Sequence, residues 1–179
     1  MEFQEVLQKR QSIRSYLPDK VEEEKLRNMI AAASMAPSWK NSQTARYYVV
    51  TGEKKLAEVK TALPPFNQKN VAQAPALIVC TAVMNQAGCN PDGTPANELG
   101  NGWGIYDCGL QNMNLLLAAA EQGLSTLVMG IRDAQMLRDL LNIPENEAVV
   151  SVIGVGYSDA APKRPDRKAM DEIAVFFKD

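Results

Sequence analysis

The 179-residue sequence contains no histidine. This absence excludes histidine-based catalytic triads and HExxH zinc sites, and it removes the side chain most often used as a general base. An enzyme with this sequence needs carboxylate, lysine or tyrosine chemistry, or a cofactor that brings its own reactivity. The lack of histidine therefore favours a cofactor-dependent enzyme or a protein without catalytic activity.

Cysteine is also scarce. Cys80, Cys89 and Cys108 form no CxxC pair and do not have the spacing of zinc ligands. Cys80 and Cys108 lie in apolar stretches, where a free cysteine behaves as a small hydrophobic residue. We therefore expect structural roles for all three cysteines and no bound metal.

Long apolar runs and strong charge are both missing. No run approaches the roughly 20 residues that span a bilayer, and the N-terminal MEFQEVLQKR lacks the apolar core of a secretory signal. The formal net charge of -2 is too small to favour nucleic acid or an acidic membrane as the main partner. We expect a cytoplasmic protein with no nucleic-acid or membrane partner.

The glycines do not form a nucleotide-binding motif. Gly100, Gly102 and Gly104 have the wrong spacing for GxGxxG, and Gly154 and Gly156 lack a third glycine. No GxxxxGK[ST] segment occurs. These observations disfavour a Rossmann site and exclude the usual P-loop.

Helical and strand patterns alternate along the chain without a regular βαβ series. Apolar spacing predicts helices over residues 2–9, 20–35, 53–63, 105–122 and 133–141. Aromatic and β-branched content predicts strands over 46–50, 76–82, 125–130 and 148–156. With no internal repeat and no linker, this pattern predicts a single domain over 1–179 with an α+β fold, or mixed α/β sandwich.

Three local features add to this outline. Asp19 is expected to cap the second helix, and residues 84–102 have the composition of a long loop. The C-terminal EIAVFF, residues 172–177, is a further strand candidate with no obvious partner inside the domain.

A basic segment, Lys9–Tyr16, follows the first helix. If it forms a helical turn, Arg10 and Arg14 share one side and Ser12 reaches the same ligand. Guanidinium groups match phosphate and carboxylate oxygens well. The segment is therefore either an anion site or a solvated basic turn.

A polar segment, Met35–Gln43, links the second helix to the first strand. Ser38, Asn41 and Gln43 offer amide and hydroxyl groups beside the aromatic Trp39. These groups could bind the edge of a planar heterocycle, or they could form a polar turn between helix and strand.

Two later segments also have possible ligand groups. Gly130 ends a buried strand, where a glycine lets a ligand approach the main chain closely. Residues 162–168 contain four cations held extended by prolines, which suggests a second phosphate contact or a solvated linker.

The order of the motifs is more specific than any one of them. RQSIRSY, APSWKNSQ, FNQKN, MGIRD and KRPDRK, with the helix DCGLQNMNLLLAAAEQGL, resemble the nitroreductase family of FMN-dependent NAD(P)H oxidoreductases over essentially the whole chain. The resemblance implies an α+β fold with a central, mostly antiparallel sheet flanked by helices. It also implies a domain-swapped homodimer, formed through the long central helix, with FMN at the interface.

The resemblance further implies a ping-pong reaction in one pocket. Hydride passes from NADH or NADPH to flavin N5 near Gly130 and then to a nitroaromatic, a quinone or a similar small acceptor, with no catalytic side chain. The FMN phosphate and ribityl chain are expected to contact Arg10, Gln11, Ser12, Arg14 and Arg167, with help from Lys163 or Lys168. The ring is expected to contact Asn67, Met129 and Gly130 of one subunit and Pro37, Ser38, Trp39 and Asn41 of the other.

The sequence departs from the family pattern at two positions. Asn70 stands where several members carry a lysine near the N1–O2 edge of the flavin, and Trp39 stands where a small residue is common. The first affects stabilisation of reduced FMN, and the second affects the width of the pocket. The loop 84–102 is a candidate lid over that pocket.

Three other functions fit the same residues. One is a specialised flavin dehydrogenase or dehalogenase with a single substrate, and another is a non-catalytic flavin-binding protein. The third, a structural dimer without flavin, leaves the two cation clusters without a purpose.

Overall fold

The computed structural model describes residues 2–178. Along the chain it forms α1 (Phe3–Lys9), α2 (Glu23–Ser34), the 3₁₀ turn η1 (Trp39–Asn41), β1 (Ala45–Val50), α3 (Glu53–Thr61), α4 (Pro65–Asn70), β2 (Ala76–Val83), α5 (Gly102–Glu121), β3 (Ser125–Met129), α6 (Ala134–Leu141), β4 (Glu147–Gly156) and α7 (Met170–Ile173).

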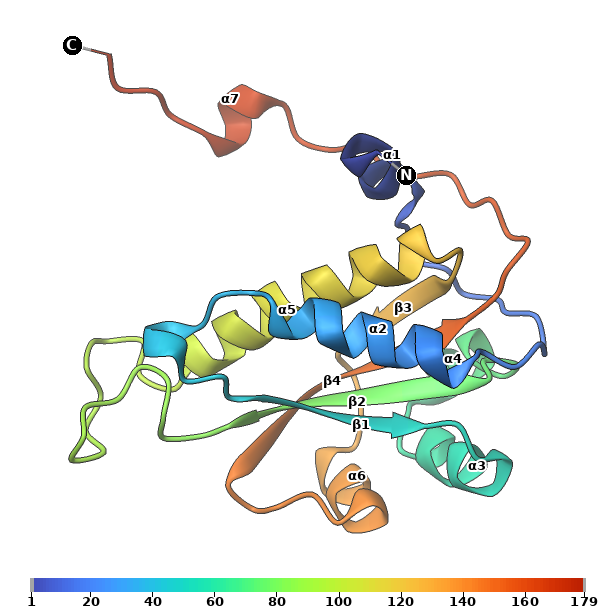
Figure 1. The fold of residues 1–179 in the computed structure, drawn as a ribbon, viewed down its shortest axis with the longest axis horizontal. Helices are drawn as coiled ribbons and strands as arrows, with labels where there is room; N and C mark the ends of the chain where they lie inside the picture. The colour runs from blue at the N-terminus through green and yellow to red at the C-terminus, as the bar shows by residue number, and fades with distance from the viewer. Residues whose placement is uncertain (1, 179) are drawn as a thin grey trace.

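The sheet has four antiparallel strands in the order β1-β2-β4-β3. The helices α2 and α5 pack together on one of its faces, and α3 and α6 lie on the other (Figure 1). The predicted α+β fold, with an antiparallel sheet flanked by helices, is confirmed.

Strand β2 shows why the sheet is covered on both faces. All eight of its residues are buried, and successive side chains point to opposite faces. Ile78 and Cys80 join the core beneath α2 and α5, whereas Leu77 and Val79 join the core beneath α3 and α6. Each fully buried aliphatic side chain of this size contributes about 1.5–3 kcal/mol to folding.

Most of the predicted elements are present, with some shifted boundaries. Asp19 does not cap α2, because that helix begins at Glu23 with Glu22 as its N-cap. The acidic residues Glu23 and Glu24 occupy its first turn, where the helix dipole favours negative charge. Helix α4 was not predicted. Its Pro65 stands at the first helical position, which proline tolerates.

The predicted strand over residues 172–177 is wrong for the single chain. Its first residues belong to α7, and the rest pair with no strand of residues 2–178. After β4 the chain passes α1 and then extends away from the body (Figure 1). A strand needs a neighbour to accept its hydrogen bonds, and this tail has none within its own chain.

Candidate functional site

The segment after α1 is extended and does not form the helical turn that was considered for Lys9–Tyr16. Ser12 forms a parallel bridge with Thr126 of β3, and the Ile13 amide donates to the Thr126 carbonyl at 3.0 Å. Alternate residues of an extended segment share a side. Ile13 is buried on one side, and Arg10 and Arg14 flank Ser12 on the other. Arg10, Ser12 and Arg14 therefore lie on one side of the segment, as expected, but the backbone that places them there is extended and not helical.

The second basic segment, residues 162–168, lies beside the first one although it is close to the C-terminus. The Arg164 guanidinium donates to the carbonyl oxygens of Leu7, Gln8 and Arg10, the last at 2.9 Å. These carbonyls belong to the C-terminal end of α1 and the residue after it, and they lack helical partners of their own. Arg164 thus fastens the segment 162–168 against α1, a role that the sequence did not reveal.

A hollow of ≈ 300 Å³ lies between the two basic segments. Its lining includes six of the predicted residues together with Arg164 and two prolines: Arg10, Gln11, Ser12, Arg14, Pro162, Lys163, Arg164, Pro165 and Arg167. Lys168, the alternative to Lys163, is not among them. We call this the cation hollow.

The cation hollow is strongly electropositive. None of the described residues that line it is acidic. Within residues 2–178, the cations that form ion pairs are Lys25, Arg27 and Lys55, and none of them lines the hollow. Burial, followed by the neighbouring Arg164 and Arg167 guanidiniums, lowers the pKa of Arg10. Guanidiniums held together in this way repel one another unless an anion lies between them. The donor set, with the Ser12 hydroxyl, fits a phosphate group.

Met129, Gly130 and Asn67 form a second part of the candidate site at the end of β3. Gly130 is exposed, and a Cβ added there would meet nothing within 4 Å. Asn67 is buried, and its Nδ2 donates to the Ile131 carbonyl at 3.3 Å. Met129 as a whole residue is only 3% exposed and belongs to the core, so within one chain it presents almost no surface to a ligand.

The turn that carries Pro37, Ser38, Trp39 and Asn41 forms the third part. The buried Asp107 of α5 accepts a hydrogen bond from the Trp39 amide at 2.8 Å. The Ser38 hydroxyl accepts one from the Gln43 amide at 3.0 Å. Neither anchor was foreseen from the sequence.

The same turn is conformationally strained. Lys40, Asn41 and Gln43 adopt φ values of 47°, 57° and 48°, a left-handed region that side chains other than glycine seldom occupy. Trp39 packs against Trp103 with ring centroids 4.8 Å apart, and Trp103 packs against Tyr106 at 5.6 Å. Strain of this kind persists only where the surrounding contacts impose it, and here those contacts come from α5.

The three parts do not all meet within one chain. The turn with η1 lies at one end of the body in Figure 1, and the basic segments lie at the opposite end, beside α1. The cation hollow and the Gly130 turn are both attached to β3. The structure therefore brings together the predicted phosphate residues, and it leaves the Pro37–Asn41 turn far from them.

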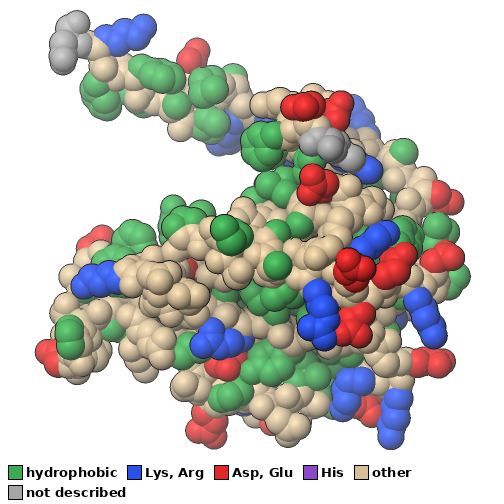
Figure 2. Space-filling view, in the orientation of Figure 1, with side chains coloured by type: hydrophobic (Ala, Val, Ile, Leu, Met, Phe, Trp, Pro, Cys, Tyr) green, Lys and Arg blue, Asp and Glu red, His purple; other side chains and the backbone are tan. Residues whose placement is uncertain are grey.

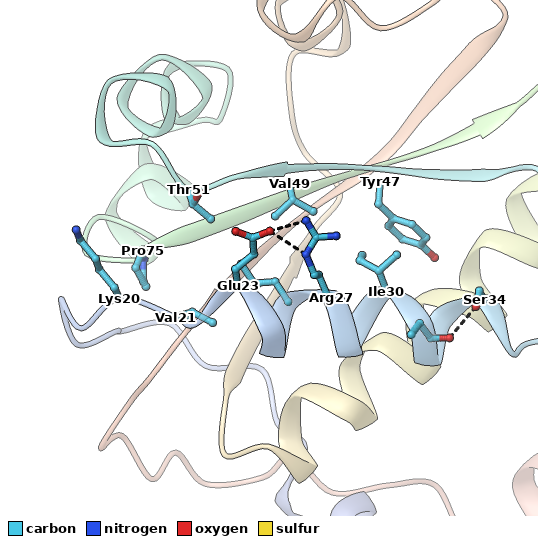
Figure 3. A pocket seen from close by; sticks show the side chains of 12 residues that line it. Lys20, Val21, Glu23, Arg27, Ile30, Ser34, Tyr47, Val49, Thr51 and Pro75 are labelled. Atoms are coloured by element: carbon cyan, nitrogen blue, oxygen red, sulfur yellow. Dashed lines mark hydrogen bonds and ion pairs between the residues drawn. The ribbon is translucent and has the colours of Figure 1, made fainter.

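Another cavity, of ≈ 820 Å³, is larger than the cation hollow and contains none of the predicted residues. It lies between α2 and the edge strand β1, with Arg27 and Ile30 facing Tyr47 and Val49 (Figure 3). The Tyr47 hydroxyl is buried without a hydrogen-bond partner among residues 2–178. Because its lining has few charges and an ion pair between Glu23 and Arg27, it offers less to an anion than the cation hollow does.

Apolar side chains are exposed on α5 and on the C-terminal tail. Tyr106 is 58% and Met113 39% exposed on α5, and Phe176 and Phe177 are 68% and 94% exposed on the tail. Figure 2 shows hydrophobic side chains gathered along this tail. Monomeric proteins seldom expose apolar surface on this scale, so both regions are candidates for contact with another molecule.

Two negative findings apply to the described part of the chain. No helix within residues 2–178 has the length and apolar character needed to cross a membrane. The same residues contain no group of three or more Cys, Asp or Glu side chains placed to hold a metal ion.

Comparisons with known proteins identify the family of this chain and its fold. The family model described as the nitroreductase family matches residues 7–157. The chain is 32% identical over 152 residues to an Archaeoglobus fulgidus protein with a provisional NADH dehydrogenase/NAD(P)H nitroreductase name, covering 83% of this chain and 80% of that protein. It is 30% identical over 155 residues to the NADPH-flavin oxidoreductase of Vibrio harveyi, covering 85% and 64%.

A solved structure has the same fold. A protein from Exiguobacterium sibiricum, crystallised in complex with FMN, superimposes with a TM-score of 0.87 at 23% identity, covering 98% of this chain and 97% of that one.

Proposed function

The chain belongs to the nitroreductase family, and we propose that it is a homodimeric, FMN-dependent NAD(P)H oxidoreductase that reduces a small organic acceptor. The cation hollow is the observation that carries this proposal. It joins two segments about 150 residues apart in the sequence into one anion site that contains no acidic side chain.

The FMN phosphate fits the cation hollow. Arg10 and Arg167 offer planar guanidinium forks, and Ser12 adds a hydroxyl donor on the same side of its segment. Lys163 adds a further positive charge, and Gln11 adds an amide. Burial is the main cause of the lowered pKa of Arg10, and repulsion from Arg164 and Arg167 adds to it; a bound phosphate would relieve that repulsion.

The flavin ring is assigned to the region around Gly130. Because β3 runs from the bridge with Ser12 to Gly130, a ligand held by its phosphate can lie along this strand. The exposed Gly130 leaves room for close approach, and its amide can donate to the ring. Asn67 donates a hydrogen bond to the carbonyl of Ile131, the residue after Gly130, and we assign it to the polar edge of the ring.

A second copy of the chain would complete the pocket. The exposed face of α5, with Tyr106 and Met113, supplies an apolar surface for a helix-to-helix interface. The tail with Phe176 and Phe177 supplies a segment that can reach across to another subunit. In such a dimer the Pro37–Asn41 turn of one subunit faces the ring held by the other, as the family resemblance implies.

The sequence fits a reaction in which the protein contributes position and charge. When bound, FMN would supply the redox chemistry, which is the transfer of hydride from NADH or NADPH to the acceptor. The chain has no histidine to act as a general base. Its contribution is to hold the phosphate, orient the ring and present the aromatic side chains of Trp39 and Trp103 near the pocket entrance.

The direct test is a visible spectrum of the purified protein with added FMN, followed by anaerobic addition of NADH or NADPH. We expect flavin bands that bleach with at least one nicotinamide and recover when a quinone or nitroaromatic is added. A protein that binds no FMN would contradict the proposal. Bound flavin that stays oxidised with both nicotinamides would contradict the assigned electron donor.

A further inference from the structure

Strand β3 separates from β4 at the point where the flavin ring is assigned. The ladder pairs Ser125–Met129 with Gly156–Val152 and then stops, although β4 begins earlier, at Glu147. From Gly130 onward the chain turns away toward α6. The main-chain groups released by this separation must find other hydrogen-bond partners if they are buried.

Arg132 supplies the missing donors. Its Nη1 donates to the carbonyl oxygen of Gly130 at 3.0 Å, and its Nη2 donates to the carbonyl oxygen of Val149 in β4. One guanidinium therefore joins the departing segment to the strand that it leaves. It takes the place of the backbone ladder just beyond Met129.

Two further contacts fix the same turn. The Asn67 amide donates to the carbonyl of Ile131 at 3.3 Å, and the Asp133 amide donates to the carbonyl of Ala62 at 2.7 Å. Arg132 is the member of this set that donates through a charged side chain. Without it, the peptide plane that follows Gly130 loses its only described side-chain partner.

The charge of Arg132 has no counter-ion among residues 2–178. The ion pairs there do not include it, and its Nε is buried without a hydrogen-bond partner. A half-buried cation bonded only to carbonyl oxygens is costly, because neutral dipoles replace its hydration incompletely. A ligand that gains negative charge beside Gly130 would offset this cost.

We propose that Arg132 is a positioning residue for the flavin. It holds the Gly130 turn in the orientation that presents its main chain to the ring, and its unpaired charge favours reduced over oxidised flavin. This inference rests on the proposed function. It also bears on Asn70, because a cation at position 132 offers one way to stabilise reduced FMN when position 70 carries none.

Arg138 provides a matched control. Its guanidinium also donates only to carbonyl oxygens, those of Ile143, Pro144 and Glu147, and also lacks an ion pair among the described residues. It lies on α6 and makes no described hydrogen bond to Gly130 or Ile131. Replacing either arginine removes a comparable set of hydrogen bonds, but only Arg132 touches the proposed ring site.

The test compares Arg132→Gln, Arg132→Lys and Arg138→Gln with the unchanged protein. The dissociation constants of oxidised and reduced FMN are measured, together with amide hydrogen exchange over residues 128–133 in the FMN-free protein. We expect Arg132→Gln to raise the ratio of the reduced to the oxidised constant about tenfold, the scale of one lost interaction with a charged group. Arg132→Lys should recover most of that ratio, because it keeps the charge.

Hydrogen exchange separates positioning from charge. Both Arg132 variants should exchange faster than the unchanged protein over 128–133, since glutamine is shorter than arginine and lysine lacks the planar fork with which the guanidinium bonds the Gly130 and Val149 carbonyls. Arg138→Gln should lower thermal stability while leaving both the FMN ratio and this exchange unchanged. An unchanged ratio in Arg132→Gln, as in Arg138→Gln, would overturn the inference alone. If the unchanged protein binds no FMN, the proposed function fails and the inference fails with it.

Discussion

The cation hollow and the Pro37–Asn41 turn differ in how completely one chain builds them. The hollow has its walls, its charge and its anchoring Arg164 within a single chain. The turn is equally well anchored, by Asp107, but it lies at the other end of the body from the hollow (Figure 1). This difference indicates that one chain forms the phosphate part of the site by itself, which we call the local half. The ring part, which we call the assembled half, also needs the Pro37–Asn41 turn of a second subunit.

The strongest challenge to the local half is reversal of charge in the hollow. Arg10→Glu replaces a phosphate donor by a repelling carboxylate, so we expect FMN affinity to fall about 100-fold, from the loss of charge-assisted hydrogen bonds. Fluorescence titration measures the change. Lys168→Glu is the control, because it makes the same change of charge in the second basic segment, at a residue that does not line the hollow. Equal losses in both variants would mean that net charge, not the hollow, governs binding.

The assembled half can be tested by separating the subunits. Tyr106→Glu combined with Met113→Glu places two charges on the exposed face of α5, and we expect a monomer by light scattering. FMN affinity should fall about tenfold, because the phosphate contacts remain and the ring contacts from the second copy are lost. Lys54→Glu on α3 serves as the surface control. A monomer that binds FMN as tightly as the unchanged protein would contradict the division into two halves.

A smaller change affects the turn without breaking the dimer. Asp107→Asn keeps the shape of the acceptor and removes the charge that strengthens its bond to the Trp39 amide. We expect about fivefold weaker FMN binding and altered tryptophan fluorescence, because Trp39 and Trp103 share a contact. Asp139→Asn, at an exposed carboxylate of α6, should change neither property. Unchanged fluorescence in Asp107→Asn would exclude an anchoring role.

The smallest expected effect concerns the cysteines. Burial raises the pKa of Cys108 to about 11, and it also raises the pKa of Cys80. Because the thiolate is the reactive form, neither should be alkylated in the native protein at pH 8, whereas the half-buried Cys89 should react. Cys89 belongs to the loop 84–102, which leads to Trp103. FMN should slow its labelling about threefold, the scale of a local change in opening; labelling of Cys108 in the native state would contradict the stated burial.

The periodic helices and strands, and the residues that line the hollow, could be predicted from the sequence. The local backbone conformation was predicted less well. The continuous apolar run 76–82 around Ile78 predicted a buried strand, because a short run of this kind is typical of a strand that is covered on both faces. Arg10 and Arg14 were grouped correctly although the backbone there is extended, since alternation in a strand and a spacing of four in a helix select the same residues.

Long-range side-chain contacts left no comparable signal. Arg164 donates hydrogen bonds to carbonyls at the end of α1, more than 150 residues away in the sequence. Asp107 of α5 accepts a hydrogen bond from the Trp39 amide in η1. Such pairings depend on the tertiary fold, and single positions do not encode them. The same holds for the tail, where an apolar pattern predicted a strand but could not supply the neighbour that a strand requires.

The most direct measurement is a parallel titration of the FMN-free protein with FMN and with riboflavin, which carries the same ring without the phosphate. If the cation hollow holds the phosphate, FMN should bind about 100-fold more tightly than riboflavin, and Arg10→Gln should remove most of that preference. Equal affinity for the two flavins would contradict the assignment of the hollow and, with it, the central claim about how this chain holds its cofactor.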